Sequence, residues 1–218
     1  VGSEMCIRDR NTVARPLCLR YFCTKHNDMA TGRTAGDGIP SPPGSGYGEF
    51  FGELTALARR MPVDEGLGAA IRDRTLAFLQ GRTLGFDTYS ELTYVRNYVG
   101  RDAANGFEAL VMSWSRGNVT SVHGHPQLAC YCFADGDFLV ETFEAVGGDL
   151  VRPSGCRRVA GGCGFYAVGL PGRFDNHIHR ITCLSERGHS LHVYSDDALK
   201  GLKYRVAEEK TGCAAGGL

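Results

Sequence analysis

The sequence has no excess charge of either sign, because its 218 residues include 24 basic and 24 acidic side chains. A protein whose main role is to bind nucleic acid or an anionic membrane usually has a clear excess of basic over acidic side chains. The sequence also lacks a run of about 18 consecutive apolar residues, which a transmembrane helix would need. We therefore expect neither a nucleic-acid partner nor a membrane partner.

The nine cysteines include no Cys-x-x-Cys pair, so the spacing of a zinc ribbon or a thioredoxin-type motif is missing. Their number is odd, and Cys130, Cys132 and Cys183 lie in apolar runs, where free cysteine acts as a small hydrophobic residue. This usage is typical of free thiols in a reducing compartment and predicts a cytoplasmic location.

The two ends of the chain differ in composition from its centre. The opening VGSEMCIRDR resembles a translated sequencing adapter, and Met29 would be a natural start. Several arginines near the beginning also permit a mitochondrial presequence, although three acids in the same segment are untypical of one. We expect a disordered or non-native leader, one folded domain and a disordered tail. Their ranges are 1–47, 48–209 and 210–218.

Glycine is abundant, with 30 residues, which favours a fold with many tight turns. Apolar residues at helical spacing predict a helix over 48–61, ended by Pro62, and a second helix over 64–80. Eight short segments rich in Val, Tyr, Phe and Thr follow. They are 92–99, 107–115, 119–124, 128–134, 137–144, 164–169, 177–184 and 189–195. This order predicts a mostly β protein, a small antiparallel barrel or jelly roll with an N-terminal helical cover.

Two His-x-His pairs stand on predicted strands, one at His123 and His125 and one at His177 and His179. Residues i and i+2 of a strand point to the same face, so each pair presents two imidazoles side by side. Two such pairs among seven histidines favour a metal site over ordinary surface or core histidines. Imidazole suits iron, copper, nickel and zinc, and the spacing does not choose among them.

Polar residues also alternate with apolar ones on two other predicted strands. Ser190, His192 and Tyr194 share one face and could form a hydrogen-bond relay, or could simply face water on a half-exposed strand. Tyr94 and Arg96 share a face in the same way, and an inward arginine would bind a carboxylate, whereas an outward one would be a surface residue. We assign the single tryptophan, Trp114, to the core.

Taken together and in this order, four segments resemble the cysteine dioxygenase family. These are small cupin-fold thiol dioxygenases with a mononuclear non-haem iron. The matching segments are YVRNYV, SWSRGNVTSVHGH, HIHRIT and SLHVYS, and the resemblance covers about 50–205. It departs at Gly124, where members commonly have Asp, and in the stretch from Cys130 to Gly136, which is one residue short.

The resemblance implies a cupin-type β-barrel with one Fe(II) site and assigns a role to each matching residue. The implied metal ligands are His123, His125 and His179, with His179 chosen over His177 because the family often follows its third ligand with Arg. The implied outer group is Ser190, His192 and Tyr194, and Arg96, beside Tyr94, would bind the substrate carboxylate. Cys130 stands where some members carry a cysteine that is thioether-linked to the tyrosine.

The activity implied is oxidation of L-cysteine by O₂ to cysteine sulfinic acid, by a monomer whose partners are the small thiol and O₂. Three alternatives stay open. The substrate could be another thiol carboxylate such as 3-mercaptopropionate, or the protein could be a metal-binding cupin without catalysis. A cupin isomerase or decarboxylase would usually need a glutamate ligand where Cys130 stands.

Overall fold

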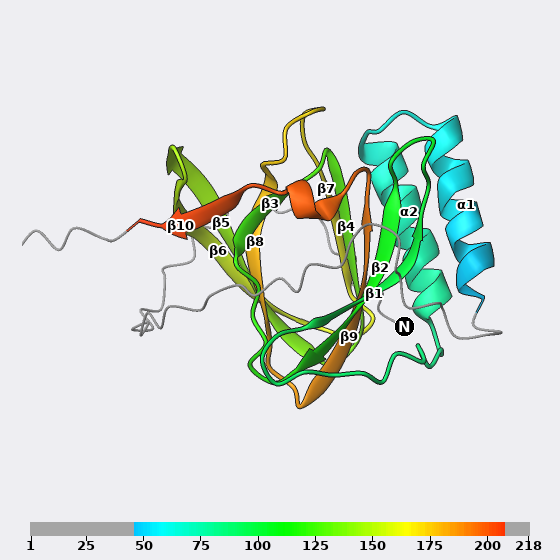
Figure 1. Cartoon of the computed structure of the whole chain (residues 1–218), viewed down its shortest axis with the longest axis horizontal. Helices are drawn as coiled ribbons and strands as arrows, with labels where there is room; N and C mark the ends of the chain where they lie inside the picture. Colours follow the sequence, from blue (N-terminus) through cyan, green and yellow to red (C-terminus); the bar gives the residue numbers. More distant parts are fainter. Residues whose placement is uncertain (1–45, 208–218) are drawn as a thin grey trace, which may run out of the picture. The chain divides into compact units, whose positions relative to one another are not determined.

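The computed structural model describes residues 46–207, which form two helices, ten strands and one short 3-10 helix (Figure 1). The helices are α1 (Tyr47–Arg60), α2 (Glu65–Leu79) and the 3-10 helix η1 (Ala198–Lys200). The strands are β1 (Val95–Arg101), β2 (Glu108–Ser115), β3 (Val122–His125), β4 (Leu128–Asp135), β5 (Asp137–Gly147), β6 (Leu150–Ala160), β7 (Gly164–Val168), β8 (Asn176–Cys183), β9 (Arg187–Tyr194) and β10 (Lys203–Val206). The expected tail, and all but the last two residues of the expected leader, lie outside the described residues.

The strands form two sheets. The first has the order β1-β2-β9-β4-β7, and the second has the order β10-β3-β8-β5-β6 and closes on itself because β10 also pairs with β6. From β2 onward the chain alternates between the two sheets, with β5 to β6 as the one step inside a sheet. Such double winding is that of a jelly roll, so the predicted mostly β, cupin-type fold is confirmed.

Both helices begin and end within one residue of the positions that the sequence predicts. The residue before a proline is pushed into an extended conformation, and Met61, before Pro62, ends α1 in that way with φ −120° and ψ 144°. The Asp64 side chain caps α2 by accepting hydrogen bonds from the backbone N–H groups of Gly66 and Leu67 at 2.9 and 3.1 Å. Neither helix in this part of the chain is long and apolar enough to cross a membrane.

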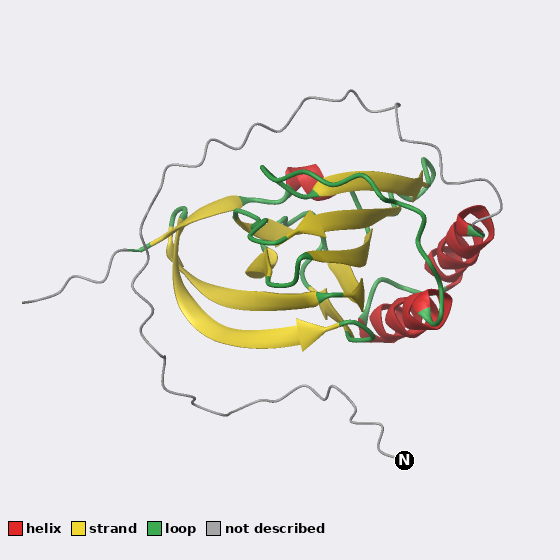
Figure 2. Cartoon of the chain, turned by 90° about the horizontal axis from the view of Figure 1, so that it is seen from below, coloured by secondary structure: helices red, strands yellow, loops and turns green. Residues whose placement is uncertain are grey.

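The two helices lie together against the first sheet (Figure 2). Helix α2 packs on β4 and β7, and α1 packs on α2 and β1. The core between these layers includes Tyr47, Phe50, Leu54, Leu67, Ile71 and Phe78 from the helices and Leu128, Cys130, Cys132, Leu191 and Val193 from the strands. The predicted helical cover is therefore confirmed.

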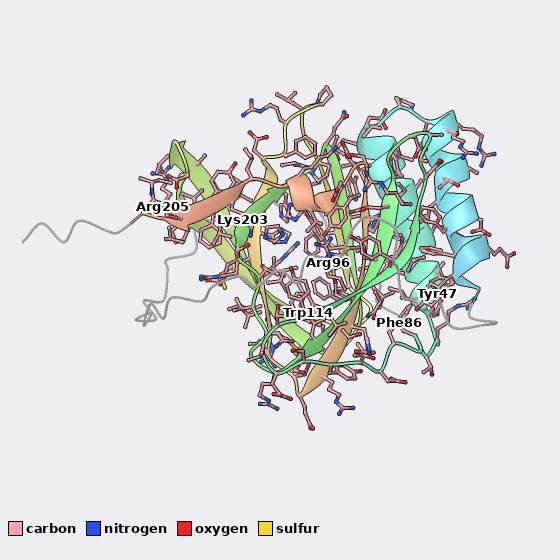
Figure 3. The ribbon with its side chains drawn as sticks, viewed as in Figure 1. Tyr47, Phe86, Arg96, Trp114, Lys203 and Arg205 are labelled. Atoms are coloured by element: carbon pink, nitrogen blue, oxygen red, sulfur yellow. The ribbon has the colours of Figure 1, made fainter. Side chains whose placement is uncertain are left out.

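A second core lies between the two sheets. It includes Leu110, Met112 and Trp114 of β2, Ala129, Tyr131 and Phe133 of β4, and Tyr194 of β9. Figure 3 shows Arg96 and Trp114 in this space, whereas Tyr47 and Phe86 lie on the helix side. Successive residues of β4 and β9 thus face two different cores, and only every second side chain points into the core between the two sheets.

Two strands are missing from the sequence prediction. Strand β6 contains Pro153 and Gly155 and is mostly exposed, so it shows neither the composition nor the alternation of a strand. Its pairing with β5 is irregular near Pro153, where Thr142 pairs with Gly155 and Phe143 with Pro153. Strand β10 has only four residues, and its partners β3 and β6 are far away in sequence. Backbone pairing, not side-chain pattern, makes both of these strands.

The close packing of Gly68 on α2 against Tyr166 on β7 allows a prediction about stability. A Cβ at Gly68 would lie 2.4 Å from the Tyr166 ring, whereas a Cβ at Gly52 of α1 would meet nothing within 4 Å. Both changes to alanine gain about 1 kcal/mol of helix propensity. Gly68→Ala should nevertheless lower the free energy of unfolding by up to about 2 kcal/mol, because overpacking costs about 1–3 kcal/mol.

Gly52→Ala is the matched control and should raise the free energy of unfolding by up to about 1 kcal/mol. Urea denaturation of both variants measures the two effects. Equal stabilisation by the two alanines would mean that α2 does not pack on β7 as closely as described.

Candidate metal centre

Three histidines from two neighbouring strands converge in the interior. In the antiparallel pairing of β3 with β8, His123 lies directly opposite His179, and His125 shares the face of His123 on the same strand. One possible ligand atom from each of the three rings lies within 4.8 Å of the others. These three side chains could therefore hold a metal ion.

Hydrogen bonds to backbone carbonyls fix two of these rings. His123 Nδ1 is 2.8 Å from the Ser121 carbonyl oxygen, and His125 Nδ1 is 3.1 Å from the Asn176 carbonyl oxygen. Because a carbonyl only accepts, each Nδ1 carries the proton and each Nε2 keeps its lone pair. The Nε2 of His125 is buried and has no hydrogen-bond partner among the described residues. An unpaired, buried acceptor of this kind fits a metal ion.

The environment keeps the imidazoles neutral. Burial holds the pKa of His125 and of His179 well below its usual range, and neighbouring imidazoles add to this effect. Only a neutral imidazole can offer a lone pair, so these rings are ready to bind a cation at pH 7 without first losing a proton.

Gly124, between the first two histidines, has no room for a side chain. A Cβ there would lie 2.6 Å from the Phe174 carbonyl oxygen and 2.7 Å from the Asp175 Cα. On its other side the Gly124 N–H donates to the Leu202 carbonyl at 2.8 Å. The absence of Asp at this position, noted as a departure from the cysteine dioxygenase pattern, therefore has a steric reason in this chain.

His177 is close to the three histidines but is not one of the three grouped ligands. Its Nδ1 lies 2.9 Å from Nδ1 of His179, so the two rings are hydrogen bonded to each other. Burial, and the charge of Arg157, lower the pKa of His177 to about 4. Of the two histidines on β8, His179 is the one that faces His123 and His125.

The polar residues of β9 form the relay that their alternation suggested. Ser190 Oγ is 2.7 Å from His192 Nε2, and His192 Nδ1 is 2.8 Å from the Tyr194 hydroxyl. Burial lowers the pKa of His192 to about 3, so its ring is neutral, and burial raises the pKa of Tyr194 so that its hydroxyl stays protonated. The Tyr194 ring stacks on His125 with 5.6 Å between centroids, which brings the relay to the histidine group.

Trp114 extends this relay by one residue. Its Nε1–H donates to Ser190 Oγ at 2.9 Å, although the sequence placed Trp114 simply in the core. The side chain is buried, so its apolar body does belong to the core, and its nitrogen ends the relay. The alternation in β2 and β9 could not reveal this, because the contact depends on Trp114 and Ser190 coming together across the sheet.

Arg96 points into the same interior. It pairs with Met112 across β1 and β2, and Met112 belongs to the core between the sheets. Its Nε and Nη2 atoms are buried without a hydrogen-bond partner in residues 46–207. The charge of Arg96 acts on the pKa values of both His192 and Tyr194. Tyr94 precedes β1 and packs on Trp114 with 4.8 Å between ring centroids.

Cys130 does not lie where the resemblance placed it. Tyr194 pairs with Ala129, and Cys130 pairs with Val193, so Cys130 faces the helices together with Cys132. The two sulfurs lie 3.9 Å apart, and Cys132 contacts the Arg72 carbonyl of α2. Cys130 and Tyr194 thus belong to different cores, because successive residues of a strand face opposite sides, and a thioether between them does not fit this arrangement.

Tyr131 is a site residue that the sequence analysis missed. Its ring centroid lies 5.3 Å from that of His125, 4.8 Å from that of His179 and 5.3 Å from that of His192. Its buried hydroxyl has no partner among the described residues, and burial raises its pKa well above the usual range. Alternation groups Tyr131 with Ala129, but only the pairing of Ala129 with Tyr194 in the structure shows that this set of β4 faces the interior.

Neither a protein-family model nor a curated protein sequence matches this chain. Solved structures with a similar arrangement include a double-stranded β-helix protein from Klebsiella pneumoniae, with 16% identity, a TM-score of 0.38, and coverage of 50% of this chain and 83% of that one. An RmlC-like cupin from Shewanella frigidimarina has 18% identity and a TM-score of 0.35, covering 47% and 75% of the two chains.

A mutant of Bacillus subtilis oxalate decarboxylase has 19% identity and a TM-score of 0.36 over 46% of this chain. The match spans only 24% of the oxalate decarboxylase chain. All three likenesses are weak, with TM-scores from 0.35 to 0.38.

The three-histidine group predicts that the protein binds a metal ion and that loss of one histidine prevents this binding. The protein loaded anaerobically with Fe(II) should hold about one iron per chain, and His179→Ala should lose it, because two imidazoles bind far more weakly than three. Metal analysis after desalting measures the content. Full occupancy in His179→Ala would transfer the role of third ligand to His177.

His189→Gln is the matched control for this experiment. The His189 ring is bound elsewhere, with its Nδ1 2.9 Å from Asp135 Oδ2 and its Nε2 3.1 Å from the Phe86 carbonyl oxygen. Loss of this histidine should leave the iron content unchanged.

Proposed function

We propose that this protein is a non-haem iron thiol dioxygenase that oxidises L-cysteine with O₂ to cysteine sulfinic acid. The observation that carries the proposal is a half-buried arginine with two buried, unpaired nitrogens. Arg96 offers Nε and Nη2 to the interior where the three histidines and the Tyr194 relay also lie. Buried donors without an acceptor cost stability, and a small carboxylate ligand would satisfy them.

The reaction is balanced without any further reagent. The thiolate sulfur loses four electrons and forms two S–O bonds, the O–O bond breaks, and both oxygen atoms remain in the sulfinate. Iron(II) held by three neutral imidazoles would keep its full charge, lower the pKa of the substrate thiol and pass electrons from sulfur to O₂. The protein itself must bind the substrate, orient it and direct hydrogen bonds.

Arg96 is the residue that orients the substrate. Its planar fork can bind both oxygens of a carboxylate, which fixes the distance and direction of the thiol relative to the histidines. The charge of Arg96 lowers the pKa of Tyr194, which supports a substrate that contacts both side chains. A thiol without a carboxylate would leave Arg96 unpaired and should be a poor substrate.

The relay on β9 presents a hydroxyl proton to the ligand. Trp114 Nε1 can only donate, so Ser190 Oγ accepts there and can donate in turn to His192 Nε2. His192 then carries its proton on Nδ1 and donates to the Tyr194 oxygen. This order leaves the Tyr194 O–H free to donate to a bound substrate or oxygen atom, and the buried tyrosine does not ionise.

The direct test is an oxygen electrode with product analysis. The full chain, loaded anaerobically with Fe(II), is offered cysteine and 3-mercaptopropionate, and the sulfinates are quantified. We expect one O₂ consumed for each cysteine sulfinate formed. O₂ uptake with 3-mercaptopropionate alone would mean that this thiol, not cysteine, is the substrate. If the fully iron-loaded protein consumes no O₂ with either thiol, the protein is a metal-binding cupin without this activity.

Substitution of Arg96 tests how the substrate is recognised. Arg96→Ala should lower kcat/KM for cysteine by about 100-fold, because a charge-assisted pair is worth about 2–5 kcal/mol when one partner is removed. For cysteamine, which has no carboxylate, kcat/KM should change less than about threefold. Steady-state kinetics with both thiols measures the difference, and equal losses would make Arg96 a structural residue.

A further inference from the structure

His177 is a half-buried histidine to which neither the metal centre nor the relay assigns a role. Its ring lies 4.9 Å from that of His179, 5.5 Å from that of Tyr131 and 5.7 Å from that of Phe165, centroid to centroid. It comes from the beginning of β8, two residues before His179. Its ring is hydrogen bonded to that of His179, with 2.9 Å between the two Nδ1 atoms.

The backbone at His177 is strained. Its φ of 45° is the only positive value at a residue other than glycine within residues 46–207. The left-handed region is unfavourable for a residue with a Cβ, and such strain persists only where the surrounding structure enforces it. A glycine would adopt this φ without cost, so the imidazole side chain is kept here despite the backbone.

The hydrogen bond has one possible direction if His179 binds a metal. Its Nδ1 faces His177, so Nε2 is the atom that offers its lone pair, and the single proton of the neutral ring is then on Nδ1. His177 must accept this proton with its own Nδ1 and carry its proton on Nε2. His123 and His125 donate in the same way to the carbonyl groups of Ser121 and Asn176.

We propose that His177 is a positioning residue that accepts the Nδ1–H of His179 and thereby sets the tautomer and orientation of the third metal ligand. It takes the place that a backbone carbonyl has beside the other two ligands. This inference rests on the metal centre of the proposed function, and it concerns metal affinity, not the thiol chemistry. Removal of the group that hydrogen bonds to the other ring nitrogen of a metal-binding histidine typically weakens metal binding about 10–100-fold.

The test compares His177→Asn with His177→Gly in the full chain. Asn tolerates a left-handed φ, and its Oδ1 stands close to the place of the histidine Nδ1, so it keeps an acceptor for His179. Gly also fits the backbone but provides no acceptor. The dissociation constant for Fe(II) is measured anaerobically by competition with a chromophoric chelator, and urea unfolding of the metal-free proteins checks that both variants fold.

We expect His177→Gly to bind Fe(II) about 10–100-fold more weakly than the wild type, and His177→Asn to bind within about threefold of it. The inference is overturned if His177→Gly binds as tightly as the wild type, or if the folded Asn variant loses as much affinity as the Gly variant. A wild-type protein that does not bind Fe(II) would overturn this inference and the proposed function together. Tight wild-type binding without thiol oxidation would overturn the proposed activity alone.

Discussion

The antiparallel pairing of β3 with β8 is the interaction on which the metal centre depends. It sets His123 opposite His179, and the backbone bonds of this pairing hold two ligands that are 56 positions apart in the chain. Gly124 makes the pairing possible, because a side chain there would collide with the backbone of Phe174 and Asp175. A shift of one residue in this register would turn His179 away from the interior and leave two ligands.

Burial gives the site its electrostatic character. Low exposure keeps the imidazoles neutral and the tyrosines protonated, so the interior offers lone pairs and hydroxyl protons at the same pH. It also leaves polar atoms of Arg96, His125 and Tyr131 without hydrogen-bond partners among the described residues. Each such atom costs stability, and all three residues come from strands of the barrel. These unpaired atoms lower the stability of the folded protein, and a charged, chelating ligand would supply the partners that they lack.

Local signals in the sequence were sufficient for part of the fold and site. Pro62 and Asp64 mark the helix boundaries, since each acts on its nearest neighbours in the chain. The relay on β9 was also predictable, because residues two apart on one strand need no long-range information to share a face. Strands β6 and β10 were missed because partners distant in sequence stabilise them, and the bond of Trp114 to Ser190 was missed for the same reason.

The sequence by itself determined which side chains are present and their spacing of two along each strand, which is enough to propose a histidine-rich barrel. The tertiary structure alone decided the phase of each strand, that is, which alternate set faces the interior. On β4 this phase places Ala129 and Tyr131 inside and turns Cys130 toward the helices. The physical reason is that strand alternation repeats every two residues, so a displacement of a single residue exchanges the two faces, and only pairing with neighbouring strands fixes it.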